Sequence, residues 1–393
     1  RVTPVDRKAD VITINGNSML AIGALAVGMR FYAGYPITPA SEIMEYFARE
    51  LPRFQGSVVQ AEDEIAALGM CLGASYSGVK AMTASSGPGI SLMVEQINLA
   101  GQAEIPVVIA DVQRGGASTG MPTKTSQGDL NLAVYGVHNE SPRIVLAASS
   151  VQDCFCAAVD AFNLSERYQC PVLLLSDQSL ATRKQTIPPP DLSAVTVCDR
   201  AAPSAEVLEA GYARYKETAT GISPMSTPGT PQGAYISTGI EHDEAGDPGY
   251  TADLARRMKE KRFRKLSTLL QEQGDRFVTI WDEGSEFDVG VIAFGSTEGA
   301  IREAIRRAAS EGYSVGHAHV RLLCPLPAGP IESFAKRCKR LLVPELNFSG
   351  QFAGLLRTHT DLKFHSYRRD DGTPLLPNEV YREITRLADG ADG

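Results

Sequence analysis

The segment Gly34-Tyr35-Pro36-Ile37-Thr38-Pro39-Ala40-Ser41-Glu42 joins a short apolar run at residues 31–33 to a helical pattern at residues 39–49. Pro39 stands where the first residue of a helix is expected, which makes Thr38 the predicted N-cap. A capped helix alone explains this turn, but free N–H groups and the Thr38 hydroxyl also suit a carboxylate ligand. The same order of strand, turn and helix recurs along the chain and is typical of a parallel sheet wrapped by helices.

Short runs that are apolar on both faces indicate interior parallel strands. Such runs occupy residues 31–33, 57–60, 80–84, 107–111, 144–147 and 172–176. Helical patterns occupy residues 17–29, 39–49, 63–77, 88–100 and 151–168. We therefore predict a doubly wound α/β domain over residues 1–185, with its ligands at the carboxyl ends of the strands.

The remainder of the chain changes character twice. Residues 186–275 are rich in Pro, Gly, Ser and Thr and are expected to be an irregular linker or excursion. A basic stretch within it, residues 258–265, is interpreted as a solvated helix face rather than a polyanion site. From residue 288 strands are predicted at 289–294, 314–320 and 340–344, and helices at 297–309 and 378–387. Residues 276–393 are thus predicted to form a second, smaller α/β domain.

Composition narrows the function classes. The chain has 393 residues, 43% of them hydrophobic, and a net charge of -8. This balance argues against nucleic acid or an anionic membrane as the main partner. No apolar run approaches the roughly 20 residues of a spanning helix, so a cytoplasmic location is expected. The seven cysteines contain no Cys-x-x-Cys pair, so we expect buried reduced thiols and no metal held by this chain.

Three further turns carry polar side chains. The acids of Glu62-Asp63-Glu64 open a helix of small residues, where they serve as dipole partners or approach a ligand or a neighbouring chain. The turn Ser85-Ser86-Gly87-Pro88-Gly89 either binds an anion or simply turns the chain. The glycine-rich loop at residues 113–125 follows a strand, where α/β proteins place ligands. Neither Gly-x-Gly-x-x-Gly nor a P-loop occurs, which argues against nicotinamide dehydrogenases and nucleotide hydrolases.

Together these motifs resemble the α subunit of the 2-oxoacid:ferredoxin oxidoreductase family. Its marker is Tyr35-Pro36-Ile37-Thr38-Pro39, and the loop from Arg114 to Thr123 is similar to the branch that uses 2-oxoglutarate. Residues 238–244 and 345–351 also look like family segments, so the resemblance covers nearly the whole chain. It implies a thiamine-diphosphate-binding domain of the pyrimidine type, followed by a transketolase-C-terminal-like domain.

The resemblance implies a cofactor site shared with a β subunit. Glu64 would hydrogen-bond the pyrimidine ring of thiamine diphosphate and be catalytic; its spacing to the next helical glycine matches the family better than that of Glu62. Tyr35, Pro36 and Ile37 would also contact the cofactor. The diphosphate, its Mg²⁺ ion and a [4Fe–4S] cluster would lie on the β subunit, in an (αβ)2 assembly.

The resemblance also implies the substrate contacts. Thr38 would hold the oxoacid carboxylate, and Arg114 would bind near the reacting carbonyl, both as catalytic residues. Lys124, with Thr123 beside it, would meet the distal carboxylate of 2-oxoglutarate. Coenzyme A would take the acyl group as succinyl-CoA, and ferredoxin would accept the electrons. Because a low-potential ferredoxin drives the reverse carboxylation, as in a reductive TCA cycle, the direction stays open.

Two alternatives accompany this interpretation. The same chemistry on pyruvate or on a branched-chain or aromatic oxoacid uses the Thr38 contact equally well. A non-catalytic binding subunit of the same fold would have lost Glu64, Thr38 or Arg114, yet all three are present. A γ domain, on a separate chain or fused ahead of a segment like this one, is a further expected partner. The residues that bind coenzyme A are left unassigned.

Overall fold

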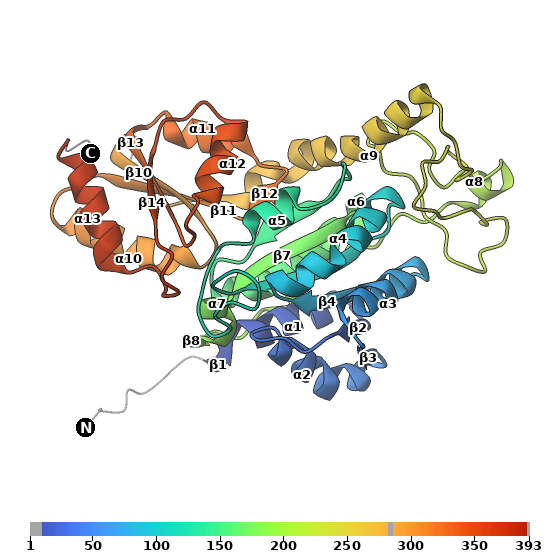
Figure 1. Ribbon diagram of the computed structural model, residues 1–393, viewed down its shortest axis with the longest axis horizontal. Coiled ribbons are helices and arrows are strands. Elements are labelled where there is room, and N and C mark those ends of the chain that lie inside the picture. The colour runs from blue at the N-terminus through green and yellow to red at the C-terminus, as the bar shows by residue number, and fades with distance from the viewer. Residues whose placement is uncertain (1–9, 282–285, 391–393) are drawn as a thin grey trace.

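The structure, a computed structural model, describes residues 10–281 and 286–390. In those residues a sheet of seven strands has the order β12-β6-β7-β5-β4-β2-β3, and all but the edge strand β12 run parallel (Figure 1). Its strands are β2 (Phe31–Gly34), β3 (Ser57–Gln60), β4 (Ala81–Ser85), β5 (Val107–Gln113), β6 (Ile144–Ala147), β7 (Pro171–Asp177) and β12 (Leu322–Cys324). All six strands predicted for the first domain are therefore confirmed.

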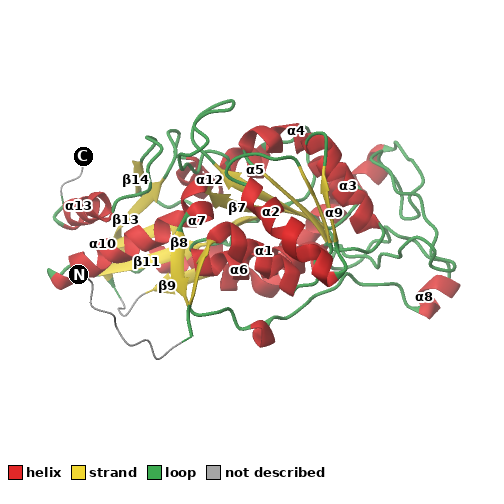
Figure 2. Cartoon of the chain, turned by 90° about the horizontal axis from the view of Figure 1, so that it is seen from below, coloured by secondary structure: helices red, strands yellow, loops and turns green. Residues whose placement is uncertain are grey.

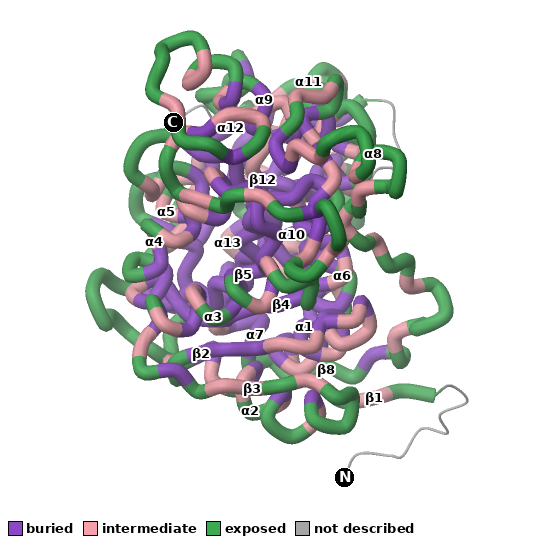
Figure 3. Tube along the Cα trace, turned by 90° about the vertical axis from the view of Figure 1, so that its right-hand side faces the viewer, coloured by how far each residue is buried: buried purple, intermediate pink, exposed green. Residues whose placement is uncertain are grey.

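Helices cover both faces of this sheet, which confirms the doubly wound fold (Figure 2). On one face lie α1 (Gly16–Ala26), α2 (Ser41–Glu50) and α6 (Val151–Tyr168). On the other lie α3 (Glu64–Tyr76), α4 (Gly87–Gln102) and α5 (Leu130–Tyr135). The short helix α7 (Gln178–Thr182) and the antiparallel pair β1 (Ile12–Asn15) and β8 (Lys184–Ile187) were not predicted. Buried positions gather along the central strands (Figure 3).

A second sheet has the order β14-β13-β10-β11-β9. Its strands are β9 (Val278–Trp281), β10 (Phe287–Phe294), β11 (Val315–Val320), β13 (Cys338–Glu345) and β14 (His365–Arg368). Helices α10 (Glu298–Ser310) and α13 (Pro377–Ala388) share one apolar cluster, while α11 (Ala328–Ala335) and α12 (Gln351–His359) join the larger core. The predicted elements of this half are present, and β9, β12, β14, α11 and α12 are additional.

The segment between the sheets contains a helix much longer than the helix face that was predicted at residues 258–265. Helix α9 (Ala252–Gln273) runs from the loops around α8 (Ala205–Glu209) toward the second sheet (Figure 1). The solvated face expected at residues 258–265 is wrong, because Lys261 and Lys265 are fully buried against Glu104. Single turns of 3-10 helix complete the described chain: η1 (Leu51–Phe54), η2 (Leu192–Ala194), η3 (Gly274–Phe277) and η4 (Gly295–Thr297).

One buried amide joins the two halves of the chain. Gln127 Nε2 donates to the Phe294 carbonyl at 3.0 Å, and Gln127 Oε1 accepts from the Leu346 N–H at 3.0 Å. The Gln127 N–H donates in turn to the Leu346 carbonyl at 2.7 Å. These bonds fix the loop after β13 against the end of the glycine-rich loop.

The composition led to expectations about the cysteines and about membrane-spanning helices. All seven cysteines are free thiols, and Cys71, Cys154 and Cys170 are buried as expected, but Cys156 is exposed. Across the two stretches of chain that are described, no helix combines the length and apolar character needed to cross a bilayer.

Candidate functional site

Four turns meet at the carboxyl edge of the seven-stranded sheet. They follow β2, β3, β4 and β5, which are parallel and hydrogen-bonded to one another in the order β5-β4-β2-β3. Because parallel strands end at one edge, residues 34–40, 61–64, 85–89 and 113–125 converge there. The edge therefore holds every residue to which the sequence assigned chemistry.

The three acids after β3 have separate positions. Asp63 is the N-cap of α3 and accepts a hydrogen bond from the Ala66 N–H at 2.7 Å. Glu62 is exposed, whereas Glu64 is 6% exposed. Ser85 Oγ donates to Glu64 Oε1 at 3.5 Å, a weak contact that leaves the carboxylate with accepting capacity. Of the three acids, only Glu64 is directed into the fold.

Helix α4 begins directly against the Glu64 carboxylate. A Cβ placed on Gly89 would lie 2.5 Å from Glu64 Oε1 and 2.0 Å from Ser85 Oγ. The glycine is therefore required by close approach, and it brings the first turn of α4 next to an acid. Positive dipole and negative charge favour each other in that arrangement.

This contact gives a testable expectation. Gly89→Ala should abolish turnover and lower the melting temperature of the protein, because its methyl group collides with both Glu64 and Ser85. The matched control is Gly299→Ala in α10, where a Cβ meets nothing within 4 Å. That control should be neutral or stabilising by about 0.5–1 kcal/mol. A Gly89→Ala protein as active and stable as the control would contradict the close approach.

The turn after β2 corrects one prediction. Helix α2 begins at Ser41, and its N-cap is Ala40, without a side-chain hydrogen bond. Thr38 is therefore not the N-cap: the N–H groups of Ala40 and Ser41 donate to the Ile37 carbonyl, and the chain turns at residues 38–40 before the helix starts. The Thr38–Pro39 peptide bond is cis.

Arg114 ties this turn to the glycine-rich loop. Its Nη1 donates to the Thr38 carbonyl at 2.6 Å, although the two residues are far apart in sequence. Arg114 is 9% exposed, and its Nε is buried without a hydrogen-bond partner among the described residues. The Thr38 residue itself is exposed. Arg114 thus has one buried N–H without a partner among the described residues, and the residue whose carbonyl it binds is exposed.

The glycine-rich loop folds back upon itself. The Gly115 N–H donates to the Lys124 carbonyl at 2.9 Å, and a Cβ on Gly115 would lie 3.5 Å from Lys124 Cβ. Lys124 therefore lies next to Arg114 in space, while Thr123 and Lys124 are both exposed. The loop is held from the second half of the chain, because the Thr125 N–H donates to the Gly372 carbonyl at 3.3 Å.

The remaining predicted contacts form the rim of the same edge. Tyr35 is 43% exposed, Pro36 is exposed and Ile37 is partly buried. All three follow β2 directly, so they present an apolar surface beside the turn that Arg114 holds. The residues that the resemblance implied thus lie in the turns that follow β2, β3 and β5.

Sequence reasoning missed two acids at this edge. Asp111, within β5, is fully buried, and burial together with the charge of Asp129 raises its pKa well above the usual range. Burial raises the pKa of Asp129 to about 6, against the opposing effect of Arg114. The available signal was an acid inside the apolar run Val-Val-Ile-Ala-Asp-Val, since buried acids are rare.

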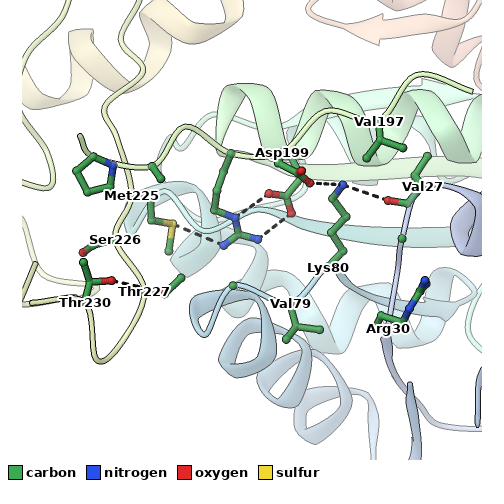
Figure 4. Close-up of a pocket in the computed structure, with 16 residues that line it drawn as sticks. Val27, Arg30, Val79, Lys80, Val197, Asp199, Met225, Ser226, Thr227 and Thr230 are labelled. Carbon is green, nitrogen blue, oxygen red and sulfur yellow. Dashed lines mark hydrogen bonds and ion pairs between the residues drawn. The ribbon is translucent and has the colours of Figure 1, made fainter. Parts of the chain in front are cut away.

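A cavity of about 530 Å³ lies at the opposite edge of the sheet, at the amino ends of β2 and β4 (Figure 4). Lys80 Nζ lies 2.7 Å from Asp199 Oδ1, and Arg200 forms a 2.7 Å ion pair with Glu166. These charges satisfy each other. The cavity therefore lies between the sheet and the loops at residues 197–203 and 225–230, and it is separate from the candidate site.

Comparison with known proteins finds two family models that match successive parts of the chain. Residues 22–261 match the family described as pyruvate flavodoxin/ferredoxin oxidoreductase, thiamine diphosphate-binding, and residues 288–375 match pyruvate:ferredoxin oxidoreductase core domain II. The 2-oxoglutarate synthase subunit KorA of Methanothermobacter marburgensis is 39% identical over 94% of this chain and 97% of its own. The 2-oxoglutarate oxidoreductase subunit KorA of Mycobacterium tuberculosis is 36% identical over 94% of this chain, which spans only 56% of that longer protein.

Solved structures agree. One of 2-oxoglutarate:ferredoxin oxidoreductase from Magnetococcus marinus, with 2-oxoglutarate, coenzyme A and succinyl-CoA bound, has 42% identity and a TM-score of 0.95 over 99% of this chain and 67% of that one. A split-gene transketolase, 12% identical with a TM-score of 0.56, shares the fold alone. The fold and the matching family model thus define an α/β protein of the thiamine-diphosphate-binding class. The chain belongs to the 2-oxoacid:ferredoxin oxidoreductase family, which confirms the resemblance.

Proposed function

We propose that this chain is the α subunit of a thiamine-diphosphate-dependent 2-oxoglutarate:ferredoxin oxidoreductase. The reaction converts 2-oxoglutarate and coenzyme A to succinyl-CoA and carbon dioxide, with the electrons passing to ferredoxin. The observation that carries the proposal is the meeting of Glu64, Arg114 and Lys124 at one edge of the sheet. The 42% identical protein with 2-oxoglutarate, coenzyme A and succinyl-CoA bound supports it.

The residues present fit the pyrimidine half of thiamine diphosphate. Glu64 is buried, yet its single hydrogen bond among the described residues is the long one from Ser85, so it can accept from a ring nitrogen. Tyr35, Pro36 and Ile37 supply an apolar rim on which a flat ring can rest. When bound, thiamine diphosphate supplies the carbon nucleophile and electron sink that the decarboxylation requires.

Two cations of the glycine-rich loop match a substrate with two carboxylates. Arg114 is anchored through Nη1 to the exposed Thr38 turn, and its other N–H groups would bind the 2-oxoacid carboxylate and carbonyl there. Lys124, with Thr123 beside it, would bind the distal carboxylate. The backbone hydrogen bond from Gly115 to Lys124 fixes the separation between Arg114 and Lys124, so the loop would select oxoacids by their length.

The assembly is part of the same proposal. A β subunit would hold the diphosphate, Mg²⁺ and a [4Fe–4S] cluster, in an (αβ)2 complex that acts with ferredoxin and a γ domain in the cytoplasm. We also propose the division of the chain into residues 1–185, 186–275 and 276–393. In this division, strand β12 belongs to the third part of the chain but extends the sheet of the first part, since it pairs with β6.

The test is viologen or ferredoxin reduction by the co-expressed α and β chains with coenzyme A, comparing 2-oxoglutarate, pyruvate and 2-oxoisovalerate. Lys124→Met should lower kcat/KM for 2-oxoglutarate by about 10- to 100-fold, because one charged hydrogen bond is lost. Pyruvate, which lacks the distal carboxylate, should be unaffected. The control is Lys363→Met, an exposed lysine away from the loop.

Two outcomes would overturn the assignment. An equal loss on 2-oxoglutarate and pyruvate would remove Lys124 from substrate selection. No turnover of any oxoacid, although thiamine diphosphate and the cluster are bound, would favour a non-catalytic binding subunit of the same fold.

A further inference from the structure

The Lys124 side chain is placed by packing, not by a polar partner. Its ammonium forms no hydrogen bond or ion pair with the described residues. Its backbone is fixed, because the Lys124 N–H donates to the Met121 carbonyl at 3.0 Å and the Lys124 carbonyl accepts from the Gly115 N–H at 2.9 Å. These bonds leave the four-carbon stem free to rotate. The direction of the ammonium therefore depends on what the stem packs against.

Gly372, from the loop after β14, packs against that stem. A Cβ on Gly372 would lie 2.8 Å from Lys124 Cβ, 3.1 Å from Lys124 Cγ and 3.3 Å from Met121 Cε. The Gly372 carbonyl also accepts a hydrogen bond from the Thr125 N–H at 3.3 Å. Gly372 is buried, whereas Lys124 and Met121 are exposed. A glycine of the second half of the chain thus covers one side of the Lys124 stem and leaves no room there for a side chain.

The loop that carries Gly372 is held by one guanidinium. Arg369 Nε and Nη2 donate to the two carboxylate oxygens of Asp371 at 3.1 and 2.7 Å, and Nε also donates to Thr373 Oγ1 at 2.8 Å. Arg369 Nη1 pairs with Glu379 in the first turn of α13. Both neighbours of Gly372 are therefore bound to Arg369. Gly372 itself has a φ of 76°, in the left-handed region that favours glycine.

We propose that Gly372 is a positioning residue for substrate selection: it holds the stem of Lys124 and so sets where the ammonium meets the distal carboxylate of 2-oxoglutarate. The inference rests on the proposed function, because it requires that carboxylate at Lys124. An oxoacid whose single carboxylate binds at Arg114 does not use Lys124. Gly372 therefore affects only substrates with a second carboxylate.

Gly372→Ala tests the contact directly. Its methyl group would collide with Lys124 Cβ, the root of the side chain, which cannot rotate away, so Lys124 has to move. The distal carboxylate is bound alike in the ground state and the transition state, so the loss should appear in KM and not in kcat. In viologen reduction by the α–β complex with coenzyme A, the KM for 2-oxoglutarate should rise about tenfold, part of what a charged hydrogen bond contributes. The kinetic constants for pyruvate should stay within about twofold.

The matched control is Gly312→Ala, in the turn after α10. Gly312 also has a left-handed φ, of 94°, but a Cβ there meets nothing within 4 Å. The two variants therefore share the backbone strain of an alanine with positive φ, and only Gly372→Ala disturbs Lys124. Gly312→Ala should leave the KM for both oxoacids within about twofold of the wild type.

Two further variants separate positioning from a general loss of structure. Lys124→Met keeps the stem without the charge, so adding Gly372→Ala to it should raise the KM for 2-oxoglutarate by less than about twofold. Arg369→Met leaves Gly372 in place and frees its loop, so it should raise the KM for 2-oxoglutarate and not that for pyruvate. This variant tests the inference even where Gly372→Ala does not fold.

The outcomes distinguish the inference from the proposed function. Equal losses on 2-oxoglutarate and pyruvate in Gly372→Ala would show a merely structural role and overturn the inference. So would a tenfold rise in KM that persists in the Lys124→Met background, or a Gly372→Ala enzyme that behaves like Gly312→Ala while Lys124→Met stays selective. A Lys124→Met enzyme that treats the two oxoacids alike would instead overturn the role of Lys124 in the proposed function.

Discussion

Replacing Glu64 by alanine should lower kcat for 2-oxoglutarate by roughly 10³-fold or more, the scale expected when a proton-handling group is lost. Glu64 is the one acid after β3 that is buried, and its carboxylate touches both Ser85 and the first turn of α4. A pyrimidine ring at this edge would find no other carboxylate from that turn. Viologen reduction by the α–β complex with coenzyme A measures the loss, and bound thiamine diphosphate is quantified in parallel.

The matched control is Glu62→Ala, an exposed acid two residues earlier in the same turn. Both variants remove one negative charge near the start of α3, and neither touches the Asp63 cap. Glu62→Ala should therefore stay within about twofold of the wild type, as an exposed substitution away from the chemistry does. An inert Glu62→Ala together with an active Glu64→Ala would exchange the two assignments. If both Glu62→Ala and Glu64→Ala are active, neither acid takes part in catalysis.

Much of the fold followed from local pattern. The six strands predicted for the first sheet are short and mostly apolar, so their existence could be predicted, with bounds within two residues of those observed. The missed strands lack such a signal. Strand β12 has three residues and is defined only by pairing with β6, about 180 positions away in the chain. Pairing over that distance leaves no period in the sequence.

Site residues could be predicted where their position depends on local structure such as a helix cap, and not where it depends on contacts between distant segments. Asp63 caps α3, so the next residue, Glu64, faces the sheet at the first helical position. Thr38 was predicted as an N-cap and is not, because Arg114, from a different strand, holds its carbonyl in a turn. Asp111 was missed because its complete burial follows from the packing around β5, which spacing alone does not reveal.

The basic stretch of α9 was misinterpreted for the same reason, since its partner Glu104 is distant in sequence. Replacing Glu104 by glutamine should lower the free energy of unfolding by about 3–5 kcal/mol, because a buried ion cluster loses its carboxylate. Lys261 Nζ lies 2.6 Å from Glu104 Oε1, and Lys265 contacts the other oxygen. All three side chains are fully buried, so the variant leaves two buried ammonium groups without a counter-charge. Denaturant unfolding of the purified complex measures the loss.

The control is Glu140→Gln, whose ion pair with Lys259 spans 3.1 Å between side chains that are 69% and 41% exposed. It should change stability by less than about 1 kcal/mol, as surface pairs do. Adding Lys261→Met to Glu104→Gln should recover part of the loss, since one unpaired buried charge is removed. Recovery in this double variant would separate a charge effect from a general loss of packing.

The difference in unfolding free energy between the wild type and Glu104→Gln should depend on pH. Burial alone would raise the pKa of Glu104, but the cations of Lys261, Lys265 and Arg214 lower it below its ordinary 4.5. Its stabilisation is therefore present above about pH 4.5 and is lost as pH falls toward the folded pKa, so wild type and Glu104→Gln should converge in acid. Burial lowers the pKa of Lys261 from 10.5 to about 7. Between these two pH values only the unfolded chain holds the proton of Lys261, so the stability of the wild type rises as pH increases through this range. A constant difference between the two proteins from about pH 7 to about pH 3 would show that the carboxylate charge does not anchor α9.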